Sequence, residues 1–228
     1  MPDPFNFDQK IALVAGGTGG LGGLIAAELR GRGCIVTTVA RSPRSDSAHI
    51  SADLRSPDAI SAVMSSIVER HGAIDIVVNA MGVVAFGTVD ATSIDTIEEL
   101  FLTNTFAHIF LMKEALKCAR QGSVLVGISG VIAEQNLPGM SVYGSSKAAV
   151  RSFNEALTRE ARRSGVRVID ARPPHTETGL ATRAIAGDPP RMPAGLAPIK
   201  VAQRIVQAIA DGETDLPSTA FSDGLIAH

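Results

Sequence analysis

Short apolar runs alternate with longer segments of mixed polarity along the 228 residues of this chain. The apolar runs are rich in β-branched residues and predict strands at residues 11–15, 36–40, 49–52, 74–79, 123–129 and 166–171. Between them, apolar positions recur at helical spacing and predict helices at residues 21–30, 57–71, 94–119, 141–164 and 199–210. Continuous apolar strands separated by helices are typical of a parallel sheet with both faces covered. The pattern therefore predicts an α/β fold built on a doubly wound parallel sheet.

No linker interrupts this pattern, so we expect a single domain over residues 1–228. Segment 173–198 differs from its surroundings, because it is richer in Pro, Gly and Thr. We expect residues 174–198 to form an insertion or a lid over a binding site.

Composition narrows the class of protein. Hydrophobic residues make up 45% of the chain and charged residues 19%, which suits a substantial core and argues against disorder. The net charge of −2, without a basic run, gives no electrostatic reason to expect nucleic-acid binding. No apolar run approaches the roughly 18 residues of a membrane span, and residues 1–6 lack the features of a signal peptide. Cys34, Cys118 and the five histidines show no metal-ligand spacing. We therefore expect a cytoplasmic protein with reduced thiols, no metal site, and no membrane or nucleic-acid partner.

A glycine-rich turn, Gly16-Gly17-Thr18-Gly19-Gly20-Leu21-Gly22, joins the first predicted strand to the first predicted helix. A helix N-terminus offers unpaired N–H groups and a favourable dipole to a pyrophosphate. Glycines allow the tight turn and let the backbone approach such a ligand closely. A merely flexible turn is the alternative, but the position between strand and helix favours dinucleotide binding. We expect the cofactor to contact Gly16, Thr18, Gly19, Gly20, Leu21 and Gly22.

Tyr143, the only tyrosine of the chain, stands four residues before Lys147 in a predicted helix. At this spacing the phenol and the ammonium lie on the same helix face. A nearby cation stabilises phenolate, so we expect the pKa of Tyr143 to fall below its ordinary value of about 10. Tyr143 would then exchange a proton near neutral pH. Together with the upstream glycine turn, this pair indicates a nicotinamide-dependent oxidoreductase.

Cofactor choice depends on the end of the second predicted strand, where an acidic residue would bind the adenosine ribose hydroxyls. This chain has Ala40 followed by Arg41 at that point, with Arg44 shortly after. A guanidinium without a neighbouring carboxylate favours a 2′-phosphate, so we expect NADP, with NAD still possible. A solvated loop arginine is the alternative interpretation of Arg41.

The chain resembles the short-chain dehydrogenase/reductase family over residues 8–221. The resemblance rests on five ordered motifs: the glycine turn, Asp53-Leu54, Asn79-Ala80-Met81-Gly82 with Asn104 downstream, Tyr143 to Lys147, and Pro173-Pro174-His175-Thr176-Glu177-Thr178. It implies a Rossmann-type sheet. The common C-terminal strand with its Thr-Gly pair is missing, and Leu216–Phe221 is at best a short substitute.

The resemblance also implies roles for these residues. Asp53, followed by Leu54, should hold the adenine amine, and Asn79 and Ala80 should line the adenosine ribose, with Gly82 of the same motif also at the cofactor. Lys147 should bind the nicotinamide ribose and lower the pKa of Tyr143. Asn104 should position a water that links Lys147 to solvent, although a polar residue that caps or bends its own helix is an alternative. The residues expected at the nicotinamide end are Pro173, Thr176 and Thr178.

One departure concerns catalysis. The family places a catalytic serine about 13 residues before the tyrosine, where this chain has Gly130. In one interpretation, a one-residue shift lets Ser129 orient the substrate oxygen. In the other, the serine is absent, and catalysis is weakened or moved to a neighbour such as Ser141.

These features predict an NADP-preferring oxidoreductase that interconverts a small-molecule carbonyl and a secondary alcohol, with Tyr143 as general acid/base. A catalytically silent nucleotide-binding protein is one rival; a sugar-nucleotide epimerase or dehydratase is another, although it would need a substrate domain for which the chain has little room. The resemblance implies a homodimer or homotetramer through helices 94–119 and 141–164. The side chains expected around an apolar substrate are Val83, Val84, Phe86, Leu137, Met140, Leu180, Ile185 and Met192.

Overall fold

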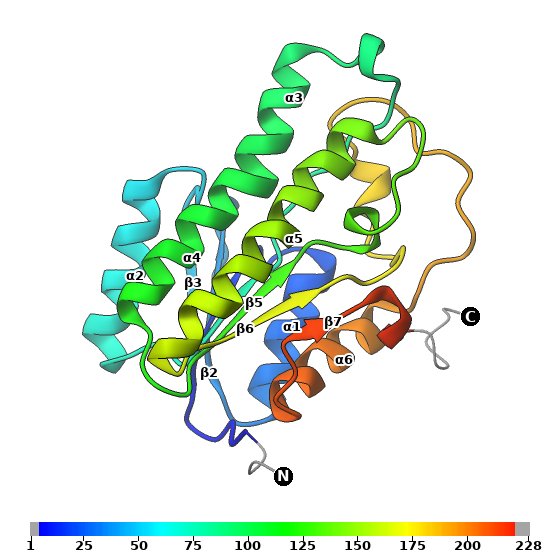
Figure 1. Cartoon of the computed structure of the whole chain (residues 1–228). Coiled ribbons are helices and arrows are strands. Elements are labelled where there is room, and N and C mark those ends of the chain that lie inside the picture. Colours follow the sequence, from blue (N-terminus) through cyan, green and yellow to red (C-terminus); the bar gives the residue numbers. More distant parts are fainter. Residues whose placement is uncertain (1–4, 222–228) are drawn as a thin grey trace.

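The computed structural model describes residues 5–221, which form a seven-stranded parallel sheet between two layers of helices (Figure 1). The strands are β1 (Ile11–Ala15), β2 (Ile35–Ala40), β3 (His49–Ser51), β4 (Ile76–Asn79), β5 (Val124–Ile128), β6 (Arg167–Ala171) and β7 (Asp215–Leu216). Their spatial order is β3-β2-β1-β4-β5-β6-β7. The direction of winding reverses between β1 and β4, and ligands bind at such a switch point in doubly wound sheets. The predicted fold class is therefore confirmed.

Two layers of helices cover the sheet. The helices are α1 (Gly20–Gly31), α2 (Pro57–His71), α3 (Ile94–Phe101), α4 (Ala107–Cys118), α5 (Ser141–Ala161) and α6 (Pro198–Ala210). In Figure 1, α2, α4 and α5 lie in front of the sheet, whereas α1 and α6 pack against each other behind it.

Side-chain alternation along the strands explains why both faces need cover. In β1, Ala12 and Val14 belong to the core beneath α1 and α6, whereas Leu13 and Ala15 belong to the core beneath α2, α4 and α5. All four side chains are fully buried. A strand that buries both faces has no polar face, which accounts for its unbroken apolar sequence.

The predicted elements lie within two residues of those in the structure, apart from the end of α5, which is Ala161 instead of residue 164, and one larger exception. At α2, the Ser56 hydroxyl accepts a hydrogen bond from the Ala59 N–H and Pro57 begins the helix, as expected. The larger exception is the helix predicted over 94–119, which is interrupted by a π-helical turn, η2 (Leu102–Phe106). Within this turn the Asn104 amide bonds the Val83 main chain and the Thr105 hydroxyl donates to the Ser146 carbonyl. These two tertiary contacts accompany the wider turn.

The remaining elements are short. Segment 174–198 contains a single 3₁₀ turn and two isolated bridges, Ala85 with Ala186 and Thr176 with Leu196. β7 has two residues and adds the last parallel pairing, so the substitute expected over Leu216–Phe221 is a strand only at Leu216, and a 3₁₀ turn (Ser218–Phe221) follows it. The ends of the predicted domain, residues 1–4 and 222–228, lie outside the described residues. Within residues 5–221, no helix has the length and hydrophobicity required to cross a membrane, and no cluster of three metal-ligating side chains occurs.

Candidate active site

A cavity of about 250 Å³ opens at the carboxyl edge of the sheet, beside the switch point. The glycine turn contributes Gly19 to Gly22 to its wall, α5 contributes Tyr143 and Lys147, and the segment after β6 contributes residues 173–176. A second cavity of about 230 Å³ shares Gly19, Ala80, Met81 and Gly82 with the first. The two cavities therefore adjoin at the edge of the sheet, and together they are called the groove.

The glycine turn is built for close backbone approach. A Cβ atom on Gly22 would lie 2.3 Å from the Gly16 carbonyl oxygen, and one on Gly16 would lie 2.8 Å from the Ala80 backbone. A Cβ on Gly20 would lie 2.7 Å from the Thr178 carbonyl oxygen. Side chains at these positions would displace backbone, so the turn, the end of β4 and the segment after β6 pack together only because these residues are glycines.

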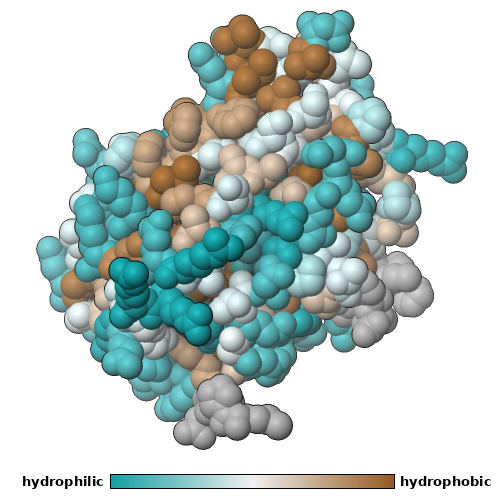
Figure 2. Space-filling model, viewed as in Figure 1, coloured by the Kyte–Doolittle hydropathy of each residue, from teal (hydrophilic) through white to brown (hydrophobic). Residues whose placement is uncertain are grey.

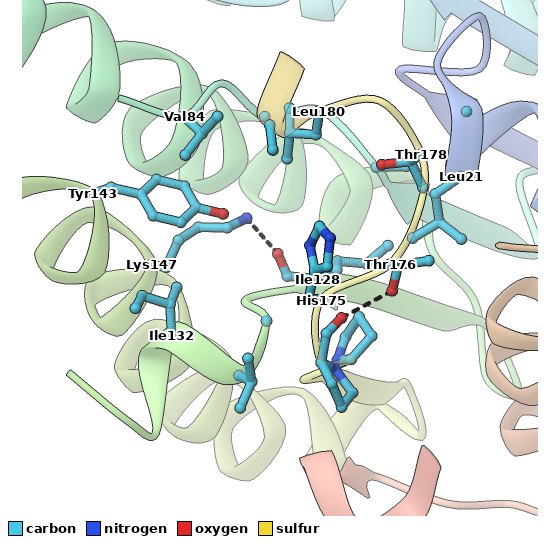
Figure 3. A pocket seen from close by; sticks show the side chains of 18 of the residues that line it. Leu21, Val84, Ile128, Ile132, Tyr143, Lys147, His175, Thr176, Thr178 and Leu180 are labelled. Atoms are coloured by element: carbon cyan, nitrogen blue, oxygen red, sulfur yellow. Dashed lines mark hydrogen bonds between the residues drawn. The ribbon is translucent and has the colours of Figure 1, made fainter. Parts of the chain in front are cut away.

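Tyr143 and Lys147 project from α5 into the first cavity (Figure 3). The Lys147 ammonium donates a 2.6 Å hydrogen bond to the Ile128 carbonyl. Burial lowers the pKa of Lys147 to about 8, against the opposing attraction of Asp170. Burial raises the pKa of Tyr143 to about 12. The direction expected from the sequence for Tyr143 is therefore wrong in this structure, because loss of water around the buried phenol disfavours phenolate.

Asn104 lies behind the cavity wall. Its Nδ2 donates to the Val83 carbonyl and to Ser146 Oγ, and its Oδ1 accepts from the Val83 N–H. A Cβ on Gly82 would lie 3.4 Å from Asn104 Oδ1 and 3.8 Å from Lys147 Nζ. Gly82 thus lets the asparagine and the lysine approach the same point.

Ser129 does not line either cavity. Its hydroxyl is fully buried and donates a 2.9 Å hydrogen bond to Asp170 Oδ2, which also accepts from Arg172 at 2.7 Å. Gly130 lies on the cavity wall instead, with φ 80° and ψ 162°, a conformation open essentially to glycine alone. This placement favours the interpretation in which no serine hydroxyl occupies the position that the family uses. Ser141, the other alternative, begins α5 and does not line the cavity.

Asn79 also lies behind the wall. Its Nδ2 contacts His108 Nδ1 at 2.9 Å, and its Oδ1 accepts from the Met81 N–H. The amide therefore shapes the end of β4 and holds His108, whose pKa burial lowers to about 4. The other predicted cofactor residues line one or both cavities, namely Gly16, Thr18, Gly19, Gly20, Leu21, Gly22, Arg41, Asp53, Leu54, Ala80, Gly82, Tyr143, Lys147, Pro173, Thr176 and Thr178.

The second cavity contains a charged pair that sequence reasoning missed. Arg55 donates to both oxygens of Asp53, and its other amino group donates to Glu99 at 2.8 Å. The Arg55 hydrogen bond holds the pKa of the Asp53 carboxyl below its usual range. Arg41 lies on the same wall and is exposed. The feature of the sequence that could have indicated this pair is the two-residue spacing between the Asp53 carboxylate and the Arg55 guanidinium.

The first cavity is mostly apolar. Six of the side chains expected around a substrate line it: Val84, Phe86, Leu137, Met140, Leu180 and Met192. Val83 lines the second cavity instead, and Ile185 lines neither. His175 also lines the first cavity, and its imidazole was overlooked as a functional group, although it stands between two prolines and a threonine of a recognised motif.

Comparison with known proteins agrees with this geometry. The model of the family described as short chain dehydrogenase matches residues 10–188. The chain therefore belongs to the short-chain dehydrogenase/reductase family, whose members are oxidoreductases that act on CH–OH and C=O groups.

Three curated relatives illustrate the range of sequence identity and coverage. Versicolorin reductase stcU of Emericella nidulans is 32% identical over 170 residues, which are 68% of this chain and 64% of that protein. A dehydrogenase/reductase SDR family protein 7-like of Anopheles gambiae is 30% identical over 92% of this chain and 75% of its own length. The 3beta-hydroxysteroid dehydrogenase of Mediterraneibacter gnavus is 28% identical over 82% of this chain and 73% of its own length. The chain thus spans slightly less than two thirds of the first of these relatives.

Solved structures show the same fold. The ligand-free aldohexose dehydrogenase of Thermoplasma acidophilum has a TM-score of 0.82 at 22% identity and covers 99% of both chains. A short chain dehydrogenase of Burkholderia cenocepacia in complex with NADP has a TM-score of 0.81 at 23% identity, over 96% of this chain and 100% of that one.

Proposed function

We propose that this protein is an NADP-preferring oxidoreductase that interconverts an apolar ketone and the corresponding secondary alcohol. The observation that carries the proposal is the convergence of the glycine turn, Tyr143 and Lys147 on one apolar cavity. The phenol and the ammonium are the only ionisable groups contributed by α5 to that cavity in the described chain.

The groove fits an extended dinucleotide. Gly16 and Gly22 leave a cradle that Cβ atoms would fill, and the groove runs from Arg41 and Asp53 at one end to Tyr143 at the other. We infer that the helix N-terminus at Gly20 binds the pyrophosphate, Leu54 and Ala80 bind the adenosine, and Thr178 binds the nicotinamide end. When bound, the nicotinamide supplies the hydride in the reductive direction.

Tyr143 and Lys147 then act on the substrate oxygen and on the proton that it receives. As the carbonyl carbon receives the hydride, the C=O electron pair moves onto oxygen, and Tyr143 donates its phenolic proton to that oxygen. A pKa of about 12 keeps Tyr143 protonated at neutral pH, as a proton donor requires. The Lys147 ammonium, which lies on the same cavity wall, stabilises the phenolate that remains.

A product assay tests the reaction. Purified protein is incubated with NADPH and, in turn, an aliphatic ketone, the bicyclic aryl ketone α-tetralone and a 3-ketosteroid. We expect at least one secondary alcohol to form in stoichiometric amount with the NADPH consumed. Tight binding of NADPH without alcohol from any ketone would contradict the proposed reaction.

Arg41 supports the preference for NADP. It is exposed at the wall of the second cavity and follows β2, where the neighbouring side chains Ala40 and Ser42 are uncharged. A guanidinium there attracts a 2′-phosphate. Arg41→Ala should weaken NADPH binding by about tenfold and change NADH binding little, as loss of one charge-assisted hydrogen bond of about 1.5 kcal/mol predicts. Arg70→Ala, in the last turn of α2 and outside the lining of both cavities, is the control.

The apolar lining supports a bulky apolar substrate. Val84, Phe86, Ile132 and Met140 form a small buried cluster against which the Tyr143 ring and Leu180 pack. One relative carries a name that refers to a hydroxysteroid, a compound with fused rings. We propose a ring-containing ketone, and we expect α-tetralone or the 3-ketosteroid to react faster than the aliphatic ketone.

Gly130 favours a second candidate, a protein that binds NADP without catalysing reduction. The cavity wall has no hydroxyl at that position, because Ser129 faces Asp170. The product assay separates the two candidates, since only the silent protein would bind NADPH and form no alcohol.

We further propose a homo-oligomer with an interface along α4 and α5. Phe106, 47% exposed, stacks on Phe110 with ring centroids 6.4 Å apart. Figure 2 shows apolar side chains gathered over α3 and along α4. Sedimentation should give a dimer or tetramer, and Phe106→Asp should shift it towards monomer.

A further inference from the structure

Carbonyl reduction needs a hydrogen-bond donor besides the tyrosine, and the cavity wall lacks a serine at position 130. As negative charge develops on the substrate oxygen, a second donor fixed at that oxygen lowers the barrier. A Cβ on Gly130 would have one neighbouring heavy atom within 4 Å, the Pro173 carbonyl oxygen at 3.9 Å. The space where a serine side chain would stand is therefore open, and the segment after β6 borders it.

Five residues of the cavity wall carry polar side chains within the described chain: Tyr143, Lys147, His175, Thr176 and Thr178. Lys147 donates to the Ile128 carbonyl and Thr176 donates to the Pro174 carbonyl. Thr178 lies against Gly20, at the glycine turn rather than beside Gly130. Lys147 and Thr176 thus have partners, and Thr178 lies elsewhere. Besides Tyr143, His175 is the remaining polar side chain of this cavity wall.

His175 lies on the segment that borders Gly130. Its neighbour two residues earlier, Pro173, accepts a hydrogen bond from the Val131 N–H at 3.0 Å. Figure 3 shows the imidazole rising into the cavity from below, with the Tyr143 hydroxyl and the Lys147 ammonium facing the same space from α5. The side chain of His175 is 28% exposed, so the ring is shielded yet open to a ligand.

The Glu177 carboxylate contacts the imidazole ring of His175. Its Oε1 lies 3.3 Å from His175 Nε2 and accepts a 2.7 Å hydrogen bond from the Gly195 N–H. A Cβ on Gly195 would lie 2.8 Å from both Glu177 Oε1 and His175 Cδ2, so only glycine lets the three groups approach. With Nε2 facing this carboxylate, Nδ1 is the ring nitrogen left to face the cavity, and it is a donor when it carries a proton.

We propose that His175 is a further catalytic residue, whose Nδ1–H donates the second hydrogen bond to the substrate oxygen, and that Glu177 positions the ring. The ionisable groups around the ring are Glu177 on its own segment, and Tyr143 and Lys147 across the cavity. The inference rests on the proposed carbonyl reduction. It places the missing donor on the segment after β6 instead of the loop after β5.

Steady-state kinetics with NADPH and α-tetralone test the proposal. His175→Leu keeps the bulk of the ring and removes the donor, so kcat and kcat/KM should fall together by about 10²–10³, the range for loss of one such donor. The primary isotope effect with 4-deuterated NADPH should rise, because hydride transfer becomes slower. His175→Gln, which retains a neutral N–H donor, should recover part of the loss, and Glu177→Gln should have a smaller effect than His175→Leu.

Control measurements separate the outcomes. NADPH affinity and unfolding temperature should be unchanged in His175→Leu, and His71→Leu, at the end of α2, should behave as the unmodified protein. If His175→Leu keeps kcat/KM within about threefold, or raises KM alone, the inference is overturned while the proposed function stands. If the unmodified protein reduces no ketone, the proposed function fails and this inference fails with it.

Discussion

The buried imidazole of His108 should make the fold sensitive to mild acid. His108 is 1% exposed; its Nδ1 accepts from Asn79 Nδ2 and its Nε2 donates to Asn154 Oδ1 at 2.7 Å. Both bonds fit the neutral ring, so protonation would set two donors, the His108 Nδ1–H and the Asn79 Nδ2 amino group, against each other. Burial lowers the pKa of His108 from its ordinary 6.5 to about 4. At 1.36 kcal/mol per pH unit, this fall is worth about 3 kcal/mol.

The sign follows from proton linkage. Between pH 6.5 and about 4 the unfolded chain binds a proton at this imidazole and the folded chain does not, so the free energy of unfolding decreases as the pH falls through that window. Urea unfolding at pH 7 and pH 4.5 should show a loss of about 2–3 kcal/mol that originates from His108.

A matched variant isolates this contribution from those of the carboxylates. His108→Gln has no titratable ring and retains an amide N–H for Asn154, so it should be less stable at pH 7 yet lose less stability on acidification. The stabilities of the two proteins should therefore converge at pH 4.5. Parallel losses in the two proteins would refute the reasoning.

Three further predictions concern the cavity. Reductive turnover should decline above about pH 8, where Lys147 loses the proton that stabilises phenolate; a plateau to pH 10 in initial rates would contradict this. Ser129→Ala should cost about 1 kcal/mol of unfolding free energy in urea and leave kcat/KM nearly unchanged, because its hydroxyl bonds Asp170 instead of facing the cavity. Gly130→Ala should cost about 1–3 kcal/mol in the same assay, because φ 80° with ψ 162° strains any residue with a Cβ; unchanged stability would show that the loop adapts.

Local sequence patterns were enough to predict much of the fold. The apolar runs located β1 and β2 to within one residue, and the Ser56-Pro57 pair located the start of α2, because caps and strand periodicity are properties of neighbouring residues. The π turn at Asn104 was not predictable in this way. It accompanies hydrogen bonds to Val83 and Ser146, which are 21 and 42 residues away.

The direction in which Ser129 points follows from strand alternation alone. Side chains alternate along β5, so Ser129 shares a face with Leu125, which packs beneath α2, α4 and α5. Continuing that alternation places its hydroxyl under α5, near Asn154 and Asp170. The pKa of Tyr143, in contrast, depends on burial by segments far along the chain, which spacing to Lys147 does not reveal.

The most direct test of the account is a single-turnover experiment with Tyr143→Phe. Protein in excess is saturated with NADPH and mixed with the ketone reduced fastest by the unmodified protein, and loss of nicotinamide absorbance is followed. The account predicts unchanged NADPH affinity and a rate of hydride transfer at least about 10²-fold slower, since general acid catalysis contributes 10²–10⁴. A rate within a few-fold of that of the unmodified protein would contradict the central claim that Tyr143 protonates the substrate oxygen.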